Sequence, residues 1–169
     1  SQGCIRIMND LGMSARIEEA VARGEFYQLD GMRLIGPSGY TLQAEFSHGV
    51  NGEKSYVAPR VFFDAVIQQH AVDSGAKFLQ AAVKAPLIEN GTVVGVQARE
   101  NGEVKAYRSR VVVGADGVTS TIMRALRPEV EQHVDKHRAV ALRAYIKGME
   151  LYPHEVEFFL YEEILPGYA

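Results

Sequence analysis

The sequence predicts a mixed α/β (α+β) fold. Part of a parallel sheet, of the kind found in cofactor-binding domains, is expected to be interleaved with an antiparallel sheet. A run of three valines, residues 111–113, stops at a Gly-Ala-Asp-Gly segment, as the carboxyl end of a buried parallel strand does. Two Asn-Gly turn signals, at 90–91 and 101–102, separate three short strand patterns. Helical and strand-like segments do not alternate regularly, which favours two interleaved layers over one doubly wound domain.

The first part of the chain predicts helices and a hairpin. Apolar residues recur at helical spacing over residues 5–11 and 15–22. Strand-like residues 32–35 and 40–46 flank a Gly-Pro-Ser-Gly segment, which is typical of a hairpin turn. A further helix is predicted over residues 61–74, because apolar side chains line one face and a glycine follows.

The second part predicts mostly strands. Three antiparallel strands form an inserted meander at about 81–108, and the buried strand 111–113 leads into a helix over 120–126. Strands are also predicted over 139–146 and 156–161. Together with residues 30–48, they are expected to build the antiparallel sheet.

Composition excludes several classes of protein. The chain has 169 residues, a net charge of −3 and 47% hydrophobic residues, so we expect a globular protein without a nucleic-acid partner. Its single cysteine, Cys4, excludes an internal disulfide and suits a reducing, cytoplasmic compartment. No run is long enough to span a membrane, which leaves peripheral membrane contact open. Neither end resembles a natural terminus, so an internal fragment of a longer protein is expected.

The segment Gly114-Ala115-Asp116-Gly117 is the first candidate site. Its small residues allow a bulky ligand to approach the main chain closely. Thr119 or Ser120 can cap the next helix, whose amino terminus favours an anion such as a pyrophosphate. We expect Asp116 to contact a ribose hydroxyl, a water or a backbone amide. The alternative is an ordinary tight turn.

Arg60 is the second candidate. A cation at the start of a helix opposes the helix dipole, and a bound anion would remove this conflict. The alternative is an exposed surface arginine.

The third candidate is Pro166-Gly167-Tyr168, where a turn places an aromatic ring that could line a pocket, although most such segments are only turns.

A metal site is not expected. His133 and His137 are four residues apart, but the glutamate of the usual zinc motif and a third ligand are both missing.

These segments resemble the flavoprotein monooxygenase-like superfamily that includes para-hydroxybenzoate hydroxylase. Residues 114–120 look like its "DG" motif, which contacts FAD and, in some members, the nicotinamide cofactor. Arg60 with Phe63 and Asp64 resembles the family's arginine helix, whose arginine lies against FAD. Within the superfamily, residues 56–60 and 165–169 look most like geranylgeranyl reductases, in which a Pro-Gly-Tyr segment lines the substrate cavity.

The resemblance also has departures. The family pattern places an arginine three residues after Ser120, where this chain has Met123 followed by Arg124. The usual G-x-G-x-x-G segment is absent from the 169 residues. We therefore expect part of an FAD site, and a fragment that is inactive alone.

The resemblance implies an FAD-dependent oxidoreductase that reduces isoprenoid double bonds, with NAD(P)H or another reductant as electron donor. It assigns residues 1–29 and 49–130 to an FAD-binding domain with a partial Rossmann-like sheet. Residues 30–48 and 131–169 would belong to a substrate-binding domain. Arg60 and Gly114 to Gly117 would contact FAD, and Pro166 to Tyr168 a small apolar substrate. The alternatives are a flavin-dependent aromatic hydroxylase or halogenase and a non-catalytic ligand-binding domain.

Overall fold

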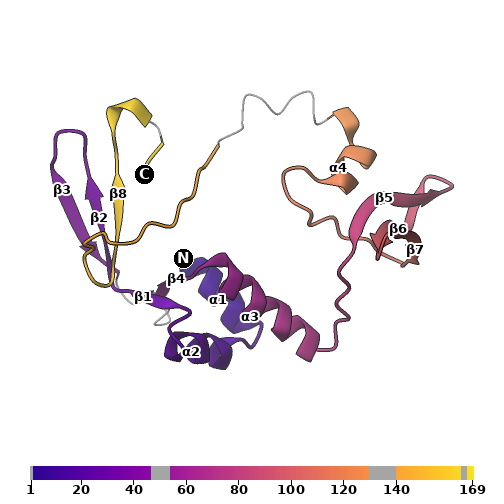
Figure 1. Cartoon of the computed structure of the whole chain (residues 1–169), viewed down its shortest axis with the longest axis horizontal. Coiled ribbons are helices and arrows are strands. Elements are labelled where there is room, and N and C mark those ends of the chain that lie inside the picture. The colour runs from indigo at the N-terminus through magenta and orange to yellow at the C-terminus, as the bar shows by residue number, and fades with distance from the viewer. Residues whose placement is uncertain (1, 47–53, 130–139, 165–166) are drawn as a thin grey trace. The chain divides into compact units, whose positions relative to one another are not determined.

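The computed structural model describes residues 2–46, 54–129, 140–164 and 167–169 (Figure 1). Contacts between Cα atoms divide the chain into two compact units. The first unit contains residues 1–77 and 146–169, and the second contains residues 78–145. No helix in the described ranges is long and apolar enough to cross a bilayer.

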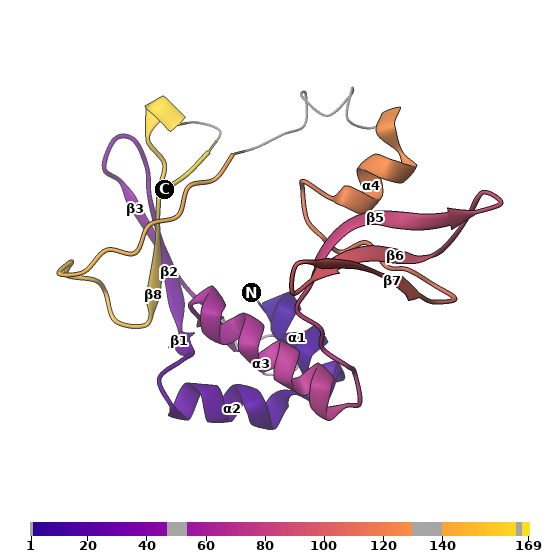
Figure 2. The ribbon, with the colours of Figure 1, turned by 45° about the vertical axis from the view of Figure 1, so that its right-hand side comes forward.

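Three helices and a strand pair form the first part of the first unit (Figures 1 and 2). The helices are α1 (Gln2–Asp10), α2 (Ser14–Ala22) and α3 (Arg60–Asp73), and β1 (Tyr27–Leu29) pairs antiparallel with β4 (Ser55–Val57). Their apolar residues recur every three or four positions and therefore share one face. The core contains Ile5, Met8, Met13, Ile17, Ala20 and Phe26, and partly buried residues of α3 pack against it. The three helices agree with the sequence prediction.

A three-stranded sheet forms the other part of this unit, in the order β3-β2-β8. Strands β2 (Gly31–Ile35) and β3 (Thr41–Glu45) make the predicted hairpin. Strand β8 (Glu155–Phe159) runs parallel to β2, and a short 3-10 helix, η3 (Glu162–Ile164), follows it.

The sequence predicted an antiparallel sheet from these segments. The pairing of β2 with β8 is parallel, so this part of the prediction is wrong. The main-chain oxygen of His154 accepts hydrogen bonds from the amides of Asp30 at 2.7 Å and Gly31 at 3.2 Å. Because these contacts join the starts of β2 and β8, the two strands leave the same point in the same direction. The strand predicted over 139–146 is also absent, since residues 140–146 form no strand; residue 139 lies outside the described ranges.

The second unit contains the predicted meander of β5 (Ala82–Glu89), β6 (Thr92–Glu100) and β7 (Glu103–Arg108), all antiparallel. Asn90 and Asn101 have φ angles of 50° and 49°, and the glycine after each also has a positive φ. Two central residues with positive φ match the twist of a tight hairpin. This explains why the two Asn-Gly signals predicted the meander correctly.

The buried strand predicted over 111–113 is not formed. These residues belong to no strand, and Val111 and Val113 are 75% and 82% exposed. A parallel strand is buried only where neighbouring strands and helices cover it, and no strand of the described chain pairs with this run. The predicted helix after it is present as α4 (Thr121–Leu126). The mixed helix-and-strand class is confirmed.

Candidate functional site

The carboxylate of Asp116 closes the turn between Gly114 and α4. Its Oδ1 accepts a hydrogen bond from the hydroxyl of Ser120. Its Oδ2 accepts one from the amide of Thr121 at 2.7 Å and a longer one from the amide of Ile122 at 3.3 Å. The sequence analysis expected a ribose hydroxyl, a water or a backbone amide as the partner of Asp116. The structure shows backbone amides in this role.

Ser120 completes the cap of this helix, as the sequence predicts. It is the N-cap residue, and its Oγ accepts a hydrogen bond from the amide of Met123 at 2.9 Å. The first amides of α4 are thus bonded within the chain. An anion predicted at this helix terminus would therefore compete with Asp116 and Ser120 for these amides.

The ionisation of Asp116 follows from these bonds. The hydrogen bond from Ser120, assisted by the amides of Ile122 and Thr121, holds the pKa of the Asp116 carboxyl below its ordinary value of 3.8. Donors that bond the charged form of a carboxylate favour that form. Asp116 is consequently an anion at neutral pH and acts as a hydrogen-bond acceptor.

Two glycines shape the turn. Gly117 has a φ of +80°, a conformation that side chains rarely adopt, and a Cβ built on it would have no neighbour within 4 Å. A Cβ on Gly114 would lie 3.1 Å from the side chain of Ile122. Gly114 therefore lets α4 approach closely, and Gly117 leaves open space beside the turn.

The residues of the turn lie at the surface. Residues 113–119 are all exposed, and no hydrogen bond within the described residues uses the amides of Gly117 or Val118. These two amides can donate to the polar atoms of a ligand. Beside the turn, a mainly apolar cavity of about 310 Å³ lies between the meander and residues 111–116, lined in part by Val83, Val96 and Ile122.

Arg60 is the first residue of α3 and belongs to the first unit. Its Nε donates to Oδ1 of Asp64 at 2.9 Å, and the Arg60 side chain is 64% exposed. Asp64 lies four residues further along the helix, so it partly offsets the unfavourable cation at the helix start. The anion that the sequence implied beside Arg60 is thus supplied in part by the chain itself.

Gly167 and Tyr168 lie beside β8, whereas Pro166 falls outside the described residues. A Cβ on Gly167 would lie 2.7 Å from the main-chain oxygen of Ile164, so the tight turn requires glycine here. Ala169 and Phe159 exchange two main-chain hydrogen bonds, at 2.7 and 3.0 Å. Tyr168 consequently packs edge-on against Phe158, with ring centroids 5.3 Å apart.

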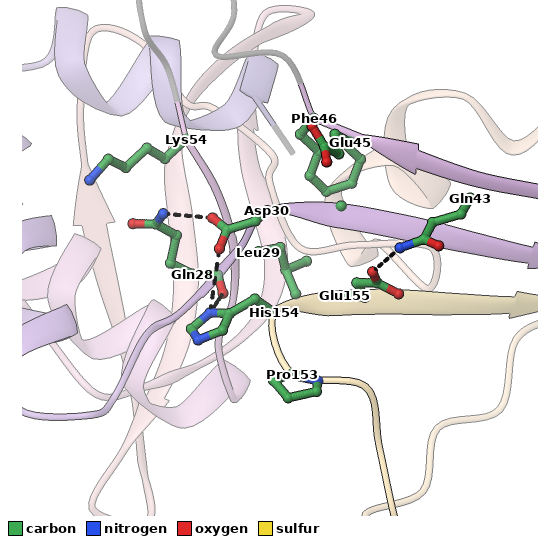
Figure 3. A pocket seen from close by; sticks show the side chains of 11 residues that line it. Gln28, Leu29, Asp30, Gln43, Glu45, Phe46, Lys54, Pro153, His154 and Glu155 are labelled. Carbon is green, nitrogen blue, oxygen red and sulfur yellow. Dashed lines mark hydrogen bonds and ion pairs between the residues drawn. The ribbon is translucent and has the colours of Figure 1, made fainter.

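The structure also contains a cleft that the sequence reasoning missed (Figure 3). It measures about 670 Å³ and lies at the starts of β2 and β8, lined by residues including Gln28, Asp30, Gln43, Lys54, His154 and Glu155. No residue spacing marks it, because its lining comes from short segments far apart in the chain. The only local signal is a Pro-His pair before a strand, which is not specific.

His154 has an unusual conformation at the edge of this cleft. Its φ is 61°, in the left-handed region that few side chains tolerate. Its ring stacks on Tyr27 with centroids 4.9 Å apart, and its Nδ1 lies 3.0 Å from the main-chain oxygen of Gln28. The carboxylate of Asp30 lies 3.8 Å from the same nitrogen. His154 therefore joins β8 to the connection between β1 and β2.

The predicted site residues thus fall into separate groups. Gly114 to Gly117 share one turn in the second unit, while Arg60, Gly167 and Tyr168 belong to the first unit. The pair His133 and His137 lies outside the described residues.

An exposed Gly-Ala-Asp-Gly turn that leads into a helix is typical of cofactor-binding domains. The chain belongs to the family described as FAD binding domain, whose profile matches residues 1–164. The turn fits this cofactor, because Gly117 and Val118 are exposed, their amides have no hydrogen-bond partner among the described residues, and Gly117 leaves room for its approach.

Two curated relatives are digeranylgeranylglycerophospholipid reductases. That of Methanosarcina acetivorans is 30% identical over 148 residues, covering 82% of this chain and 34% of the relative. That of Methanothrix thermoacetophila is 32% identical over 148 residues, covering 83% and 36%. The chain therefore spans about a third of the length of these relatives.

Solved structures share the fold. A geranylgeranyl bacteriochlorophyll reductase-like protein from Thermoplasma acidophilum matches with a TM-score of 0.64 at 23% identity, over 84% of this chain and 36% of that one. A variant of a flavin-dependent brominase matches with a TM-score of 0.55 at 23% identity, over 66% and 26%. At these identities the likeness shows the fold alone.

Proposed function

We propose that this chain is part of an FAD-dependent reductase that saturates isoprenoid double bonds in a lipid. The observation that carries the proposal is the similarity to two digeranylgeranylglycerophospholipid reductases, each at 30% identity or more over most of this chain. Bound, reduced FAD supplies a hydride for such a reaction. The contribution of this chain is to hold the cofactor and to orient an apolar substrate.

The sheet β3-β2-β8 supports the proposal that the substrate is apolar, because one of its faces is apolar. Cross-strand register aligns Ala44, Met32 and Val156 in one row, and Leu42, Leu34 and Phe158 in the next. Alternate residues of a strand face opposite sides, so these six side chains share one apolar face. None of the six is buried, and Leu42 is 62% exposed.

The other face of the same sheet is mostly polar, with Ile35 and Phe159 as apolar residues at one end. Gln43, Arg33 and Glu157 align there, and Arg33 forms an ion pair with Glu155. Apolar surface left unburied on one side of a two-faced sheet favours contact with an apolar ligand. We propose that the isoprenoid chain lies on the apolar face, next to Tyr168 and with Pro166 and Gly167 shaping its edge.

The turn and the family resemblance support the cofactor residues that we propose. Gly117 would present its amide to FAD, with Gly114, Ala115 and Asp116 holding the main chain in position. Arg60 is proposed as an FAD contact on the family resemblance alone. Residues 1–29 and 49–130 would form part of the FAD-binding domain, and residues 30–48 and 131–169 part of the substrate-binding domain. NAD(P)H is one candidate electron donor, and peripheral contact with a membrane would give access to a lipid substrate.

An anaerobic turnover assay tests the reductase. The intact protein that contains this chain is reduced with dithionite and mixed with a geranylgeranyl phospholipid, and mass spectrometry follows the product. We expect a gain of two hydrogens per reduced double bond and reoxidation of the flavin. A requirement for oxygen would instead indicate the hydroxylase or halogenase that the brominase fold allows, and lipid binding without flavin would indicate a non-catalytic domain.

Two adjacent exposed residues test the apolar face. Leu42→Asn places an amide on the proposed lipid surface, whereas Thr41→Asn places one on the opposite face. We expect the first variant to raise the KM for the lipid about fivefold or more and the second to change it little. Equal effects would argue against a lipid site on this face.

A further inference from the structure

We propose that the cleft at the starts of β2 and β8 holds the head group of the lipid substrate. The cleft favours a head group that donates hydrogen bonds, through a hydroxyl or an ammonium, over a bare phosphate. This inference rests on the proposed function, because it places the head group relative to an isoprenoid chain on the apolar face of the sheet β3-β2-β8. It adds the site and the chemistry that recognise the polar end of the substrate.

The apolar face of this sheet leads into the cleft. One row of that face contains Met32 and Ala44, and two residues nearer the cleft come Asp30 and Phe46. The amide of Phe46 donates to the main-chain oxygen of Asp30 at 2.7 Å, so the pairing of the two strands extends to this row. Residues two apart on a strand face the same side and lie about 7 Å apart. The surface therefore changes from apolar to polar within one row, where Asp30 and Phe46 line the cleft.

The cleft has the size of a ligand site. Its volume of about 670 Å³ lies within the range of pockets that hold small molecules. Leu29, Phe46 and Pro153 give it apolar surface, and its polar residues come from segments that the fold brings together (Figure 3). All of its lining belongs to the first unit, as does the apolar face. One amphipathic molecule can thus place its chain along the face and its polar end in the cleft.

Hydrogen bonds within the chain hold several polar groups of the cleft in place (Figure 3). Nε2 of Gln28 donates to Oδ1 of Asp30 at 2.8 Å. The carboxylate of Glu155 accepts from Nε of Arg33 and, at 2.5 Å, from Nε2 of Gln43. The charge of Glu155 is thereby balanced, so this residue belongs to the wall of the cleft. Groups that are already oriented lose less conformational freedom when a ligand binds.

The groups that remain for a ligand are mainly acceptors. Nδ1 of His154 lies 3.0 Å from the main-chain oxygen of Gln28. Because a carbonyl oxygen only accepts, this nitrogen carries the hydrogen, and Nε2 of the neutral ring is an acceptor. The carboxylate of Asp30 keeps unused lone pairs beside its bond from Gln28. No hydrogen bond or ion pair within the described residues engages the carboxylate of Glu45.

The charges of the lining favour the same chemistry. With Glu155 balanced by Arg33, the carboxylates of Asp30 and Glu45 remain, against the single ammonium of Lys54 among the described residues that line the cleft. A bare phosphate is an anion that offers only acceptors to a ring of acceptors, so it is disfavoured here. A hydroxyl or an ammonium donates to them instead.

The test compares lipids that share geranylgeranyl chains and differ in head group. The intact protein that contains this chain reduces lipids with a phosphoglycerol, a phosphoethanolamine or a bare phosphate head, and the steady-state KM is measured for each. We expect the KM for the first two to be at least about fivefold lower than for the third. Turnover of all three with equal KM, or a lower KM for the bare phosphate, would overturn this inference alone. A lack of turnover with any of them would overturn the proposed reductase and this inference with it.

Variants of Glu45 test the cleft itself, with Glu157→Gln as the matched control. Glu157 lies one row further along the same face as Glu45, outside the described lining of the cleft. Glu45→Gln should reduce the preference over bare phosphate at least about twofold, and the control should leave it unchanged. Glu45→Lys should lower the KM for the bare phosphate while raising that for phosphoethanolamine. A damaged fold raises all three KM values together, so it cannot produce this reversal. A preference that survives in Glu45→Lys, or that falls equally in the control, would show that the head group binds elsewhere.

Discussion

The carboxylate of Asp116 accepts a hydrogen bond from the amide of Thr121 at 2.7 Å, across the turn that joins the exposed valine run to α4. This contact makes Asp116 part of the helix cap, in addition to any role toward FAD. Asp116→Asn keeps one acceptor for the amides, whereas Asp116→Ala removes both. We expect the alanine variant to weaken FAD binding about fivefold more than the asparagine variant, measured by flavin fluorescence. Equal loss in both would mean that the charge alone matters.

The same carboxylate predicts a pH dependence of stability. Its pKa in the folded protein lies below the ordinary value of 3.8, so the folded state favours the charged form. The stabilisation is complete above the pKa of the unfolded chain and disappears as the pH falls through the lower folded pKa. Thermal unfolding midpoints of wild type and Asp116→Asn should differ constantly above about pH 5 and converge below pH 3.8. A difference that persists at lower pH would contradict this explanation.

Arg60 can be separated from its ion pair with Asp64. If Arg60 contacts FAD, Arg60→Gln should weaken FAD binding about tenfold, because a hydrogen bond from a cation to an anion is lost. Asp64→Asn removes the ion pair at 2.9 Å but keeps the cation, so it should leave the affinity within about twofold. The two variants are compared by flavin titration. Similar behaviour of both would show that Arg60 serves only its helix.

The left-handed conformation of His154 limits what can replace it. A β-branched residue at a φ of 61° should lower the free energy of unfolding by about 1–2 kcal/mol, so His154→Val is expected to be destabilised. Asparagine tolerates this conformation and loses only the ring contacts, so His154→Asn should be about 1 kcal/mol more stable than His154→Val. Urea unfolding of the intact protein measures both. Equal stability of the two variants would mean that the junction relaxes.

Two tyrosines beside β8 provide a matched test of the substrate surface. Tyr168 packs on Phe158, which belongs to the apolar face, whereas Tyr161 stacks on Phe159, which belongs to the other face. We expect Tyr168→Ala to raise the KM for a geranylgeranyl lipid about threefold to tenfold, and Tyr161→Ala to change it little. The assay is steady-state reduction by the intact protein. The reverse order would place the lipid on the polar face.

Local sequence signals predicted local structure well. Helical spacing located α1, α2 and α3, and the two Asn-Gly pairs located the meander, because positive φ angles at both turn positions are a property of those residues. The Ser120 cap could also be predicted from the sequence, since a hydroxyl before a helix accepts a hydrogen bond from an amide three residues later. The family resemblance added the FAD assignment.

Features that join segments far apart in the chain could not be predicted from local sequence signals. The valine run 111–113 has the composition of a buried strand, yet burial depends on neighbouring strands that the run does not have in the described chain. The parallel pairing of β2 with β8 and the cleft beside His154 both depend on contacts across more than a hundred residues.

The sequence by itself determined the class of fold, the turn from Gly114 to Gly117 and its likeness to an FAD-binding motif. These follow from side-chain volume, backbone freedom and residue order, which act over a few positions. Only the tertiary structure decided the partners of Asp116, the direction of β8 and the two faces of its sheet. Hydrogen bonds and burial at those places depend on which groups meet in space, and spacing along the chain does not specify that.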